Sequence, residues 1–344
     1  MEYRRLGASD LEAPTVVYGA WAIGGWYWGG TDDRAAVAAL QRAIDVGMNA
    51  VDTAPMYGCG HSERLVGQAI RGRRDRVLVL TKCGMRWDRE DGVFSFRSED
   101  PQVGKIKVHI TLKPDSVIEE CERSLRRLGT DHIDLYQCHW PDPTTPAEDT
   151  MAALLKLRDQ GKIRAIGTSN SSPELLDRFL SKGSVASEQP RYSPLDRRIE
   201  EKIVPYCLEK GIGLLVYSPL EQGLLTGKVT MDRTFDAKDE RGALPWFQPA
   251  NRRRVLDALD LLRPIAAEHR CTLGQLALAW IIGRPGITSA IVGARTAAQV
   301  EENAGAGDIV LTTDQRARVT AVYESLGKPR KVTTASRVFE QADS

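Results

Sequence analysis

Four side chains that can hold or transfer a proton follow short apolar runs of the sequence: Asp52, Tyr57, Lys82 and His139. A lysine ammonium about 4 Å from a tyrosine would stabilise the phenolate by roughly 4 kcal/mol, so Tyr57 is expected to titrate near neutrality. The carboxylate of Asp52 would hold Lys82 charged, and His139 could orient a substrate oxygen by hydrogen bonding. A proton donor aimed at an oxygen that becomes an alkoxide suits the reduction of a carbonyl group.

Each of these residues also has an ordinary structural interpretation. An aspartate before a threonine often caps a helix, an isolated lysine is usually a surface charge, and an isolated histidine is usually a hydrogen-bonded core residue. Their coincidence favours a site only if the strands that precede them end at one rim. The elements that carry these residues must therefore lie parallel.

Eight short apolar runs alternate along the chain with segments of helical spacing. Strands that alternate with helices are joined by crossovers and lie parallel, and eight such units are the number that closes a barrel. The runs are residues 15–18, 49–51, 76–80, 132–136, 163–166, 185–188, 212–217 and 288–292. The glycines expected to end helices in a left-handed conformation are Gly47, Gly129, Gly161, Gly183 and Gly211.

The sequence therefore predicts an α/β fold, a (β/α)8 TIM barrel that forms a single domain over residues 1–328. A doubly wound sheet is disfavoured because no GxGxxG turn follows the first strand. Residues 3–15 predict an N-terminal β-hairpin that caps the bottom of the barrel. Long loops are expected after strand 3 (residues 83–113) and strand 7 (residues 218–251), and loops of this length are usually functional. Residues 329–344 are expected to form a polar C-terminal tail.

Composition excludes several classes of protein. The chain has 344 residues and a formal net charge of +1, without the broad basic field that nucleic acid or anionic lipid attracts. No apolar stretch reaches membrane-spanning length, and the first residues lack the apolar core of a signal peptide. The six cysteines are scattered and are interpreted as free thiols of a cytoplasmic protein. Two basic clusters, residues 71–76 and 252–254, are interpreted as solvated helix ends.

Four segments carry a resemblance to a known family: VDTAPMYG at residues 51–58, LTK at 80–82, YQCHWPD at 136–142 and GKIRAIGTSN at 161–170. Over residues 3–326 the chain resembles the aldo-keto reductases, and its long loops resemble the bacterial and potassium-channel beta-subunit branch. The resemblance implies a tetrad of Asp52, Tyr57, Lys82 and His139. Tyr57 would be the general acid, and hydride would come from a reduced nicotinamide nucleotide.

The resemblance also implies a site for NADPH or NADP+. Ser169, Asn170 and Gln189 can hydrogen-bond an amide and would hold the nicotinamide carboxamide, while Tyr217 would stack on its ring. The glycine-punctuated loop of residues 218–228, which ends in Lys228, suits a pyrophosphate. Other expected cofactor contacts are Trp21, Asp52, Ser218, Pro219, Leu220, Gln222, Gly223, Leu225, Gly227, Gly293, Arg295, Gln299, Glu302 and Asn303.

The expected activity is the reduction of a small aldehyde or ketone to an alcohol, by a monomer or a homo-oligomer. Tryptophans that follow the first and fourth strands predict an aromatic pocket beside the tetrad. Arg295, at the start of an expected helix, supplies the cation that a preference for NADPH requires. The expected substrate contacts are Trp21, Trp26, Trp28, Tyr57, His139 and Trp140.

Two other functions are compatible with this barrel. The first is a redox-sensing or binding subunit with little turnover, since potassium-channel beta subunits share the scaffold. The second is a metal-dependent hydrolase or aldolase that uses Asp52, His61 and His139. The metal site is disfavoured because Lys82 would place a cation beside the metal and no two histidines have a close ligand spacing, so no metal is expected.

Overall fold

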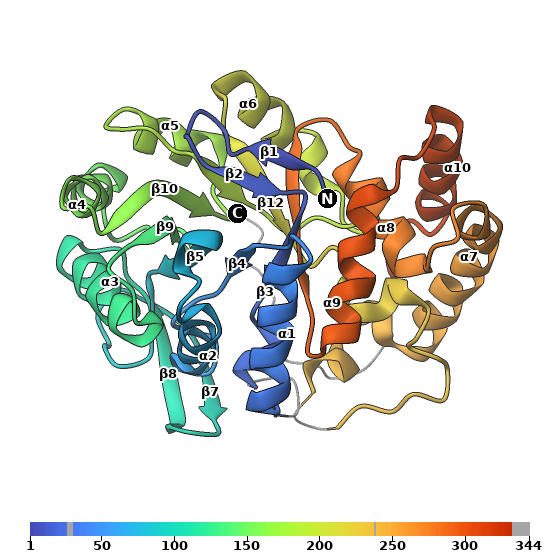
Figure 1. The fold of residues 1–344 in the computed structure, drawn as a ribbon, viewed down its shortest axis with the longest axis horizontal. Coiled ribbons are helices and arrows are strands. Elements are labelled where there is room, and N and C mark those ends of the chain that lie inside the picture. Colours follow the sequence, from blue (N-terminus) through green and yellow to red (C-terminus); the bar gives the residue numbers. More distant parts are fainter. Residues whose placement is uncertain (26–29, 237–238, 332–344) are drawn as a thin grey trace.

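A computed structural model describes residues 1–25, 30–236 and 239–331. Eight parallel strands form a closed barrel in the spatial order β10-β11-β12-β13-β3-β4-β5-β9, and helices surround it (Figure 1). Each of the eight predicted runs contributes one barrel strand, so the (β/α)8 fold is confirmed. The strands are β3 (Val16–Gly19), β4 (Ala50–Asp52), β5 (Leu78–Cys83), β9 (Ile133–Cys138), β10 (Ile163–Ser169), β11 (Ser187–Gln189), β12 (Gly213–Tyr217) and β13 (Ile287–Gly293).

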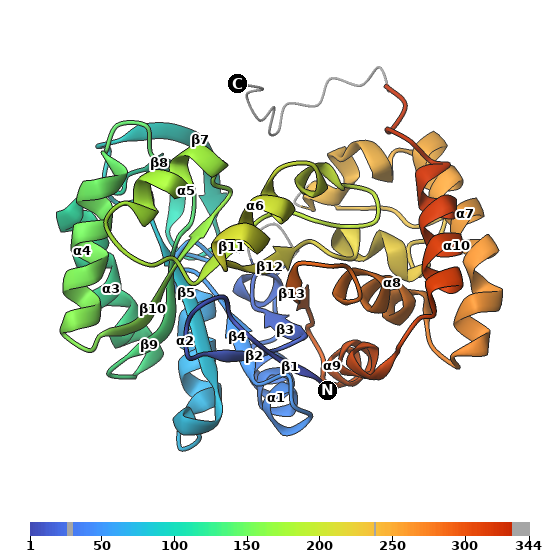
Figure 2. The same ribbon diagram turned by 90° about the horizontal axis from the view of Figure 1, so that it is seen from above.

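The helices bury apolar faces in the interior of the protein, and α10 does so against α7 instead of the barrel. In α1 this face is formed by Ala36, Leu40 and Ala43, and the side chain of Asp32 accepts a hydrogen bond from Ala35 N to start the helix. Figure 2 shows α10 lying beside α7 on one flank. The helices are α1 (Asp33–Asp45), α2 (His61–Ile70), α3 (Pro114–Leu128), α4 (Ala147–Asp159), α5 (Pro173–Leu180), α6 (Ile203–Lys210), α7 (Pro249–Glu268), α8 (Leu273–Ile282), α9 (Ala297–Ala304) and α10 (Thr313–Glu324).

Four of the five glycines expected to end helices take a positive φ, as predicted. Gly183 does not, and that prediction was wrong. A Cβ at Gly183 would lie 3.1 Å from Leu155 Cδ2 of α4. The glycine therefore allows the side chains of α4 to pack closely there, and it does not serve as a left-handed helix end.

The N-terminal hairpin is confirmed as the cap of the barrel's lower end. Strands β1 (Tyr3–Arg5) and β2 (Glu12–Pro14) pair antiparallel. Leu6 and Leu11, from the turn between them, join the apolar cluster that fills the barrel interior. The hairpin leads into the start of β3, so it closes the end opposite to the loops that follow the strands (Figure 1).

The connection after β5 is long, as expected, but it is not a simple loop. It folds into a small antiparallel sheet in the order β6-β8-β7, whose strands the sequence analysis missed. Pairing runs from Asp100 opposite Gly104 to Val93 opposite Ile110, with an irregularity between Phe94 and Phe96. That irregularity breaks the alternation of apolar and polar residues that would have signalled strands. The strands are β6 (Met85–Arg86), β7 (Val93–Asp100) and β8 (Gly104–Ile110).

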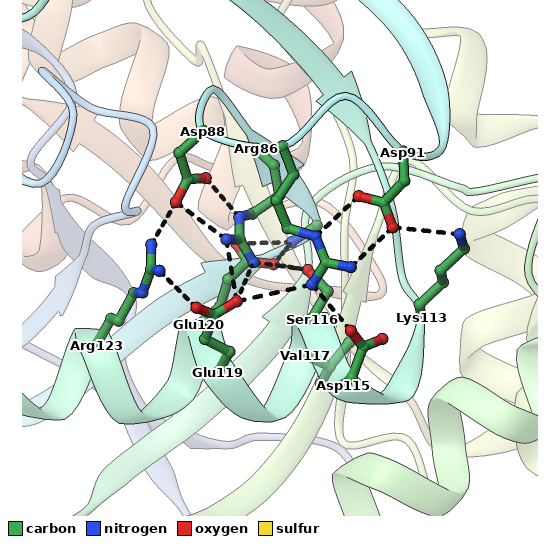
Figure 3. Close-up of polar contacts among 12 residues, drawn as sticks. Arg86, Asp88, Asp91, Lys113, Asp115, Ser116, Val117, Glu119, Glu120 and Arg123 are labelled. Atoms are coloured by element: carbon green, nitrogen blue, oxygen red, sulfur yellow. Dashed lines mark hydrogen bonds and ion pairs between the residues drawn. The ribbon is translucent and has the colours of Figure 1, made fainter.

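A cluster of charged side chains ties this sheet to α3 (Figure 3). Arg86, which is 2% exposed, donates to Asp88 Oδ1 at 2.8 Å, to Ser116 Oγ at 2.8 Å and to Glu119 Oε2 at 3.1 Å. Arg123 of α3 also pairs with Asp88 and Glu119. Because the arginine is buried and uses several of its donors, these contacts fix the sheet on the helix.

Glu120 lies beneath this cluster, and its side chain is buried. Its carboxylate accepts hydrogen bonds from Gly84 N at 3.0 Å and from Ser116 Oγ at 3.3 Å. Burial raises the pKa of Glu120 to about 8, although the charge of Arg86 and these hydrogen bonds act in the opposite direction.

Glu120→Gln is expected to make unfolding less dependent on pH between pH 5 and 8. The folded wild type retains a proton in this range that the unfolded chain releases, so its stability falls as pH rises toward 8. An amide has no such proton to lose. As pH rises, the free energy of unfolding of the variant minus that of wild type should therefore increase, by up to roughly 1.4 kcal/mol per pH unit. Urea unfolding at pH 5, 6.5 and 8 measures this trend, and a constant difference would contradict it.

The second long connection, after β12, contains three short 3-10 helices: η4 (Glu221–Thr226), η5 (Glu240–Ala243) and η6 (Pro245–Phe247). The first part of the expected C-terminal tail is attached to α7, since Arg330 N donates to Asn251 Oδ1 at 2.9 Å. The rest of the tail, residues 332–344, lies outside the described residues.

The six cysteines form no disulfide; five are buried and Cys271 is partly exposed. Among the described residues, no helix has the length and apolar character that a membrane crossing requires.

Candidate active site

The four chemistry-bearing residues meet at the ends of neighbouring strands. Asp52 ends β4, Lys82 lies near the end of β5, His139 follows β9, and Tyr57 lies in the connection to α2. Lys82 Nζ donates to Asp52 Oδ1 at 2.6 Å and to Tyr57 OH at 3.2 Å. The ring of His139 stands edge-on to that of Tyr57, with centroids 5.9 Å apart. The structure therefore brings all four together, as the strand-end pattern predicts.

Burial governs the protonation of this group. It raises the pKa of Tyr57 above its ordinary value, and the opposing effect of the Lys82 charge is smaller. Burial also acts to lower the pKa of Lys82, but the charge and hydrogen bonds of Asp52 and Tyr57 together outweigh it, so the net pKa is raised. Burial and then the Lys82 charge hold the pKa of His139 well below its usual range. The expectation that Tyr57 titrates near neutrality was wrong because it omitted this burial.

Asp52 is held by two glutamines. Gln189 Nε2 donates to Asp52 Oδ2 at 2.9 Å and to Gln137 Oε1 at 3.0 Å, and Gln137 Nε2 lies 3.3 Å from the same aspartate oxygen. Gln137 pairs in register with Lys82 on the neighbouring strand and was not predicted as a site residue. A polar residue within the apolar run of β9 was the available signal. The amide nitrogen of Gln189, expected at a carboxamide, is directed at Asp52 instead.

The connection that carries Tyr57 is fixed by buried hydrogen bonds. The hydroxyls of Thr53 and Ser62 lie 2.9 Å apart, and Ser62 Oγ donates to Ala20 O at 2.8 Å. Glu63, beside Ser62, accepts from Thr81 Oγ1 at 2.7 Å and pairs with Arg127 of α3. These contacts tie the start of α2 to β3 and β5, so the backbone around Tyr57 has little freedom to move.

Polar side chains of β10 and β12 form a second group at the same rim. Asn170, which takes a positive φ of 59°, donates through Nδ2 to His139 O at 3.2 Å and accepts from Tyr217 OH at 2.9 Å. Ser169 Oγ donates to Gln189 O at 2.7 Å. Asn170 therefore links the end of β10 to His139 and to Tyr217, as the proximity of strand ends predicts.

Glu188, buried behind this group, holds the turn that contains Asn170. Its carboxylate accepts from Ser171 N at 2.9 Å and from Thr168 Oγ1 at 2.5 Å. Burial raises the pKa of Glu188 to about 7 in spite of these hydrogen bonds. Glu188 was not predicted as a site residue, because a single glutamate at the end of a short strand carries no motif of its own.

The loop after β12 has an unusual backbone. Gln222 and Gly223 take positive φ angles of 52° and 93°. Its first turn is anchored by buried Glu221, which accepts from Arg191 Nη2 at 2.6 Å and from Ser193 Oγ at 2.5 Å. The other residues of this loop expected at a cofactor are Ser218, Pro219, Leu220, Leu225, Gly227 and Lys228; the side chains of Leu220 and Leu225 are buried in the core.

The start of α9 closes the other side of the rim. Arg295 donates through its guanidinium to Gly30 O at 2.7 Å, and its backbone N donates to Gln299 Oε1 at 2.8 Å. Asn303 Nδ2 donates to Gly293 O at 3.3 Å. Gly293, Arg295, Gln299 and Asn303 all belong to the expected cofactor set; these bonds link the end of β13 to the first turn of α9 through Gln299 and to its last turn through Asn303.

An ion pair links the loop after β12 to α9. Lys228, at the end of the β12 loop, pairs with Glu302 of α9 at 2.6 Å. Both residues were expected at the cofactor from the sequence, but their contact with each other was not predicted.

The expected aromatic pocket is described in part. The ring of Trp21 lies 6.4 Å from that of Tyr57, and Trp140 packs against the small sheet. Trp26 and Trp28 lie outside the described residues. The sheet contributes Met85, Ile106 and Val108 to an apolar cluster that the sequence did not predict. Met56, one residue before Tyr57, belongs to this cluster, and Trp87 and Phe96 are partly buried against it.

The residues proposed for the alternative metal site are engaged elsewhere. His61 Nε2 lies 2.9 Å from Asp33 Oδ1, while Asp52 pairs with Lys82. Within the described part of the chain, no three histidine, cysteine or carboxylate side chains are grouped as metal ligands.

Comparison with known proteins agrees with this geometry. The model of the Aldo/keto reductase family matches residues 15–324. The NADH-specific methylglyoxal reductase of Escherichia coli (strain K12) is 39% identical over 93% of this chain and 98% of its own length. The "Probable voltage-gated potassium channel subunit beta" of Oryza sativa subsp. japonica is 34% identical over 96% of this chain and 98% of its own.

A solved structure, the glycerol dehydrogenase AKR11B4 from Gluconobacter oxydans, superposes with a TM-score of 0.85. It is 36% identical and covers 97% of this chain and 99% of that one. Fold, family match and relatives agree over nearly the whole length. The chain belongs to the aldo-keto reductase family of oxidoreductases.

Proposed function

We propose that this protein reduces an aldehyde or ketone to an alcohol with NADPH, and that Tyr57 donates the proton. The observation that carries the proposal is the phenol of Tyr57 within 3.2 Å of the Lys82 ammonium, which is itself fixed by Asp52 at 2.6 Å. A reduced nicotinamide supplies the hydride when it is bound.

The protonation states suit this role. Tyr57 stays protonated at neutral pH because its pKa is raised, so it is ready to donate. An alkoxide is a far stronger base than a phenolate, so the transfer to a substrate oxygen remains favourable. The Lys82 ammonium then stabilises the phenolate left on Tyr57. His139, held neutral, can donate a hydrogen bond that orients the carbonyl oxygen.

The residues at the rim fit a nicotinamide dinucleotide. Ser169 and Asn170 offer a hydroxyl and an amide for a carboxamide, and Tyr217 offers a ring for stacking. The positive-φ turn at Gln222 and Gly223 presents a backbone without bulky obstruction, since a Cβ at Gly223 would meet nothing within 4 Å. We assign the other expected loop and α9 residues to the same ligand.

Arg295→Ala is expected to weaken NADPH binding by roughly 10- to 150-fold and to leave NADH binding nearly unchanged. A guanidinium at the N-terminus of α9 can form a bidentate pair with the ribose phosphate that only NADPH carries, and such a pair contributes about 1.5–3 kcal/mol. Quenching of tryptophan fluorescence measures both dissociation constants.

Lys228→Ala is the matched control for Arg295, because a contact with the pyrophosphate is common to both nucleotides. It should weaken both alike. Equal weakening of both nucleotides by Arg295→Ala would remove the basis for the NADPH preference, which matters because a relative 39% identical is NADH-specific.

The activity itself is tested by nucleotide consumption with purified protein and a panel of carbonyl compounds. The names of two relatives suggest where to begin: methylglyoxal in the reductive direction and glycerol with the oxidised nucleotide in the other. We expect saturable turnover with at least one aldehyde. Absence of turnover with the whole panel and with both nucleotides would overturn the proposal.

A further inference from the structure

Outside the candidate active site, a groove of about 630 Å³ lies between α2 and α3 on the flank of the barrel. The two helices lie side by side in Figure 1 and Figure 2. Six arginines line the groove, and no acidic residue does; residues 71–76, interpreted above as part of a solvated helix end, supply two of them. The six are Arg64, Arg71, Arg74, Arg123, Arg126 and Arg127.

Three of these arginines are neutralised by carboxylates. Arg74 pairs with buried Asp134 at 2.7 Å, and Arg127 pairs with buried Glu63 at 2.6 Å. Arg123 pairs with Asp88 and Glu119 in the cluster of Figure 3. Their guanidinium groups therefore serve the fold, and they are not available as the main recognition groups for a ligand.

The other three have no carboxylate partner in the described part of the chain. Arg64 donates only to the neutral carboxamide of Gln102, at 2.8 Å. Arg71 and Arg126 are exposed, and within residues 1–25, 30–236 and 239–331 neither forms a hydrogen bond or an ion pair. The groove thus holds three positive charges that only a group from outside the described chain could neutralise.

Helix ends explain part of this charge but not all of it. Arg71 directly follows α2, and Arg126 is in the last turn of α3, where cations interact favourably with the helix dipole. Arg64 is in the second turn from the start of α2, where a cation gains nothing from the dipole. It nevertheless lines the same groove.

The shape of the groove suits a compact ligand. A Cβ at Gly67 would lie 2.6 Å from Leu128 O, so the two helices touch backbone to backbone at that point. A neighbouring cavity shares Arg74 and Arg126 but is also lined by Glu122 and Asp131, which would repel an anion at that end. The volume falls in the range of small-ligand sites, and guanidinium groups match phosphate oxygens in geometry.

We propose that the groove between α2 and α3 binds a small anion that carries several linked phosphates, held by Arg64, Arg71 and Arg126. Such an anion supplies negative charge to both walls at once. A single phosphate could engage only one wall well, so affinity should rise steeply with the number of phosphates. This site is independent of the nucleotide site proposed at the barrel rim.

Inorganic tripolyphosphate is the probe, titrated into the full-length protein by calorimetry at constant ionic strength. We expect saturable binding, at least tenfold weaker with Arg71→Ala/Arg126→Ala and much weaker for inorganic monophosphate. The control is Arg253→Ala/Arg318→Ala, which removes the same charge from α7 and α10 and should leave the dissociation constant within twofold. The substituted arginines are all exposed, so the variants should unfold at the temperature of wild type.

Three results would overturn the proposal. Absence of saturable binding would remove the site, and equal weakening by both double variants would reduce it to general charge attraction. The third concerns location: Arg295→Ala should leave tripolyphosphate binding unchanged, and a loss there would place the anion in the nucleotide site instead.

Discussion

Tyr57→Phe is expected to lower kcat for carbonyl reduction by a factor of about 10² to 10⁴ or more, and to leave the affinity for the nucleotide nearly unchanged. The substitution removes the proton donor and nothing else that the proposed cofactor residues use. Lys82 keeps its contacts with Asp52 Oδ1 at 2.6 Å and Thr53 O at 3.0 Å, so the lost hydroxyl leaves no buried charge without a partner.

Steady-state kinetics give kcat, and fluorescence quenching gives the dissociation constant of the nucleotide. Unfolding temperatures of wild type and variant should agree within a few degrees. If the variant kept a substantial fraction of wild-type kcat while it remained folded, Tyr57 would not be the acid. The proposed reaction would then need another donor at the rim, and His139→Gln would be the next variant to measure.

Lys82→Met should have the second largest effect, a fall in kcat of similar order at neutral pH. At an effective dielectric constant of 20, a unit charge at about 4 Å contributes roughly 4 kcal/mol to the stability of a phenolate, or about three pKa units. Loss of the ammonium raises the pKa of Tyr57 further above its already elevated value. The phenol becomes a weaker acid, and the alkaline limb of the pH–rate profile should move to higher pH.

Lys82→Met also affects stability, because Lys82 and Asp52 form a buried ion pair. A double variant that removes both charges is therefore needed as a control. The side chains of Lys82 and Asp52 are 0% and 3% exposed, and removal of the lysine alone leaves a buried carboxylate that costs about 3–5 kcal/mol. Lys82→Met/Asp52→Asn restores neutrality and should recover much of that stability without recovering kcat. If the double variant recovered both its stability and its kcat, Lys82 would act by stabilising the fold and not through the pKa of Tyr57.

The barrel could be predicted from the sequence because its signals are local. Each strand is a short apolar run, and four of five helix-ending glycines take the positive φ that their position requires. The β6-β8-β7 sheet could not, because the irregularity between Phe94 and Phe96 interrupts the alternation of β7, and most residues of β7 are exposed or only partly buried. Gly183 also could not be predicted from local pattern, because its surroundings are side chains of α4, Leu155 and Met151, that meet it only in the folded chain.

The residues of the candidate site could be predicted from the sequence, but their hydrogen-bond partners and pKa values could not. Strand ends identify Asp52, Lys82 and His139 because parallel strands bring such ends together. The orientation of Asp52 depends on Gln137 and Gln189, which come from strands 85 and 137 residues further along the chain. The pKa of Tyr57 depends on how much water the folded chain excludes, and no sequence pattern encodes that quantity.

The small sheet beside the tetrad has a consequence for how this scaffold can diversify. All of its strand pairing lies between residues 85 and 110, so its backbone bonds are independent of the barrel's register. It is attached by the arginine pairs with α3 shown in Figure 3 and by apolar contacts with the connection after β4. In such a chain the sheet can change in sequence and shape without disturbing the barrel strands that position Asp52, Lys82 and His139, provided that Arg86 and its partners are kept.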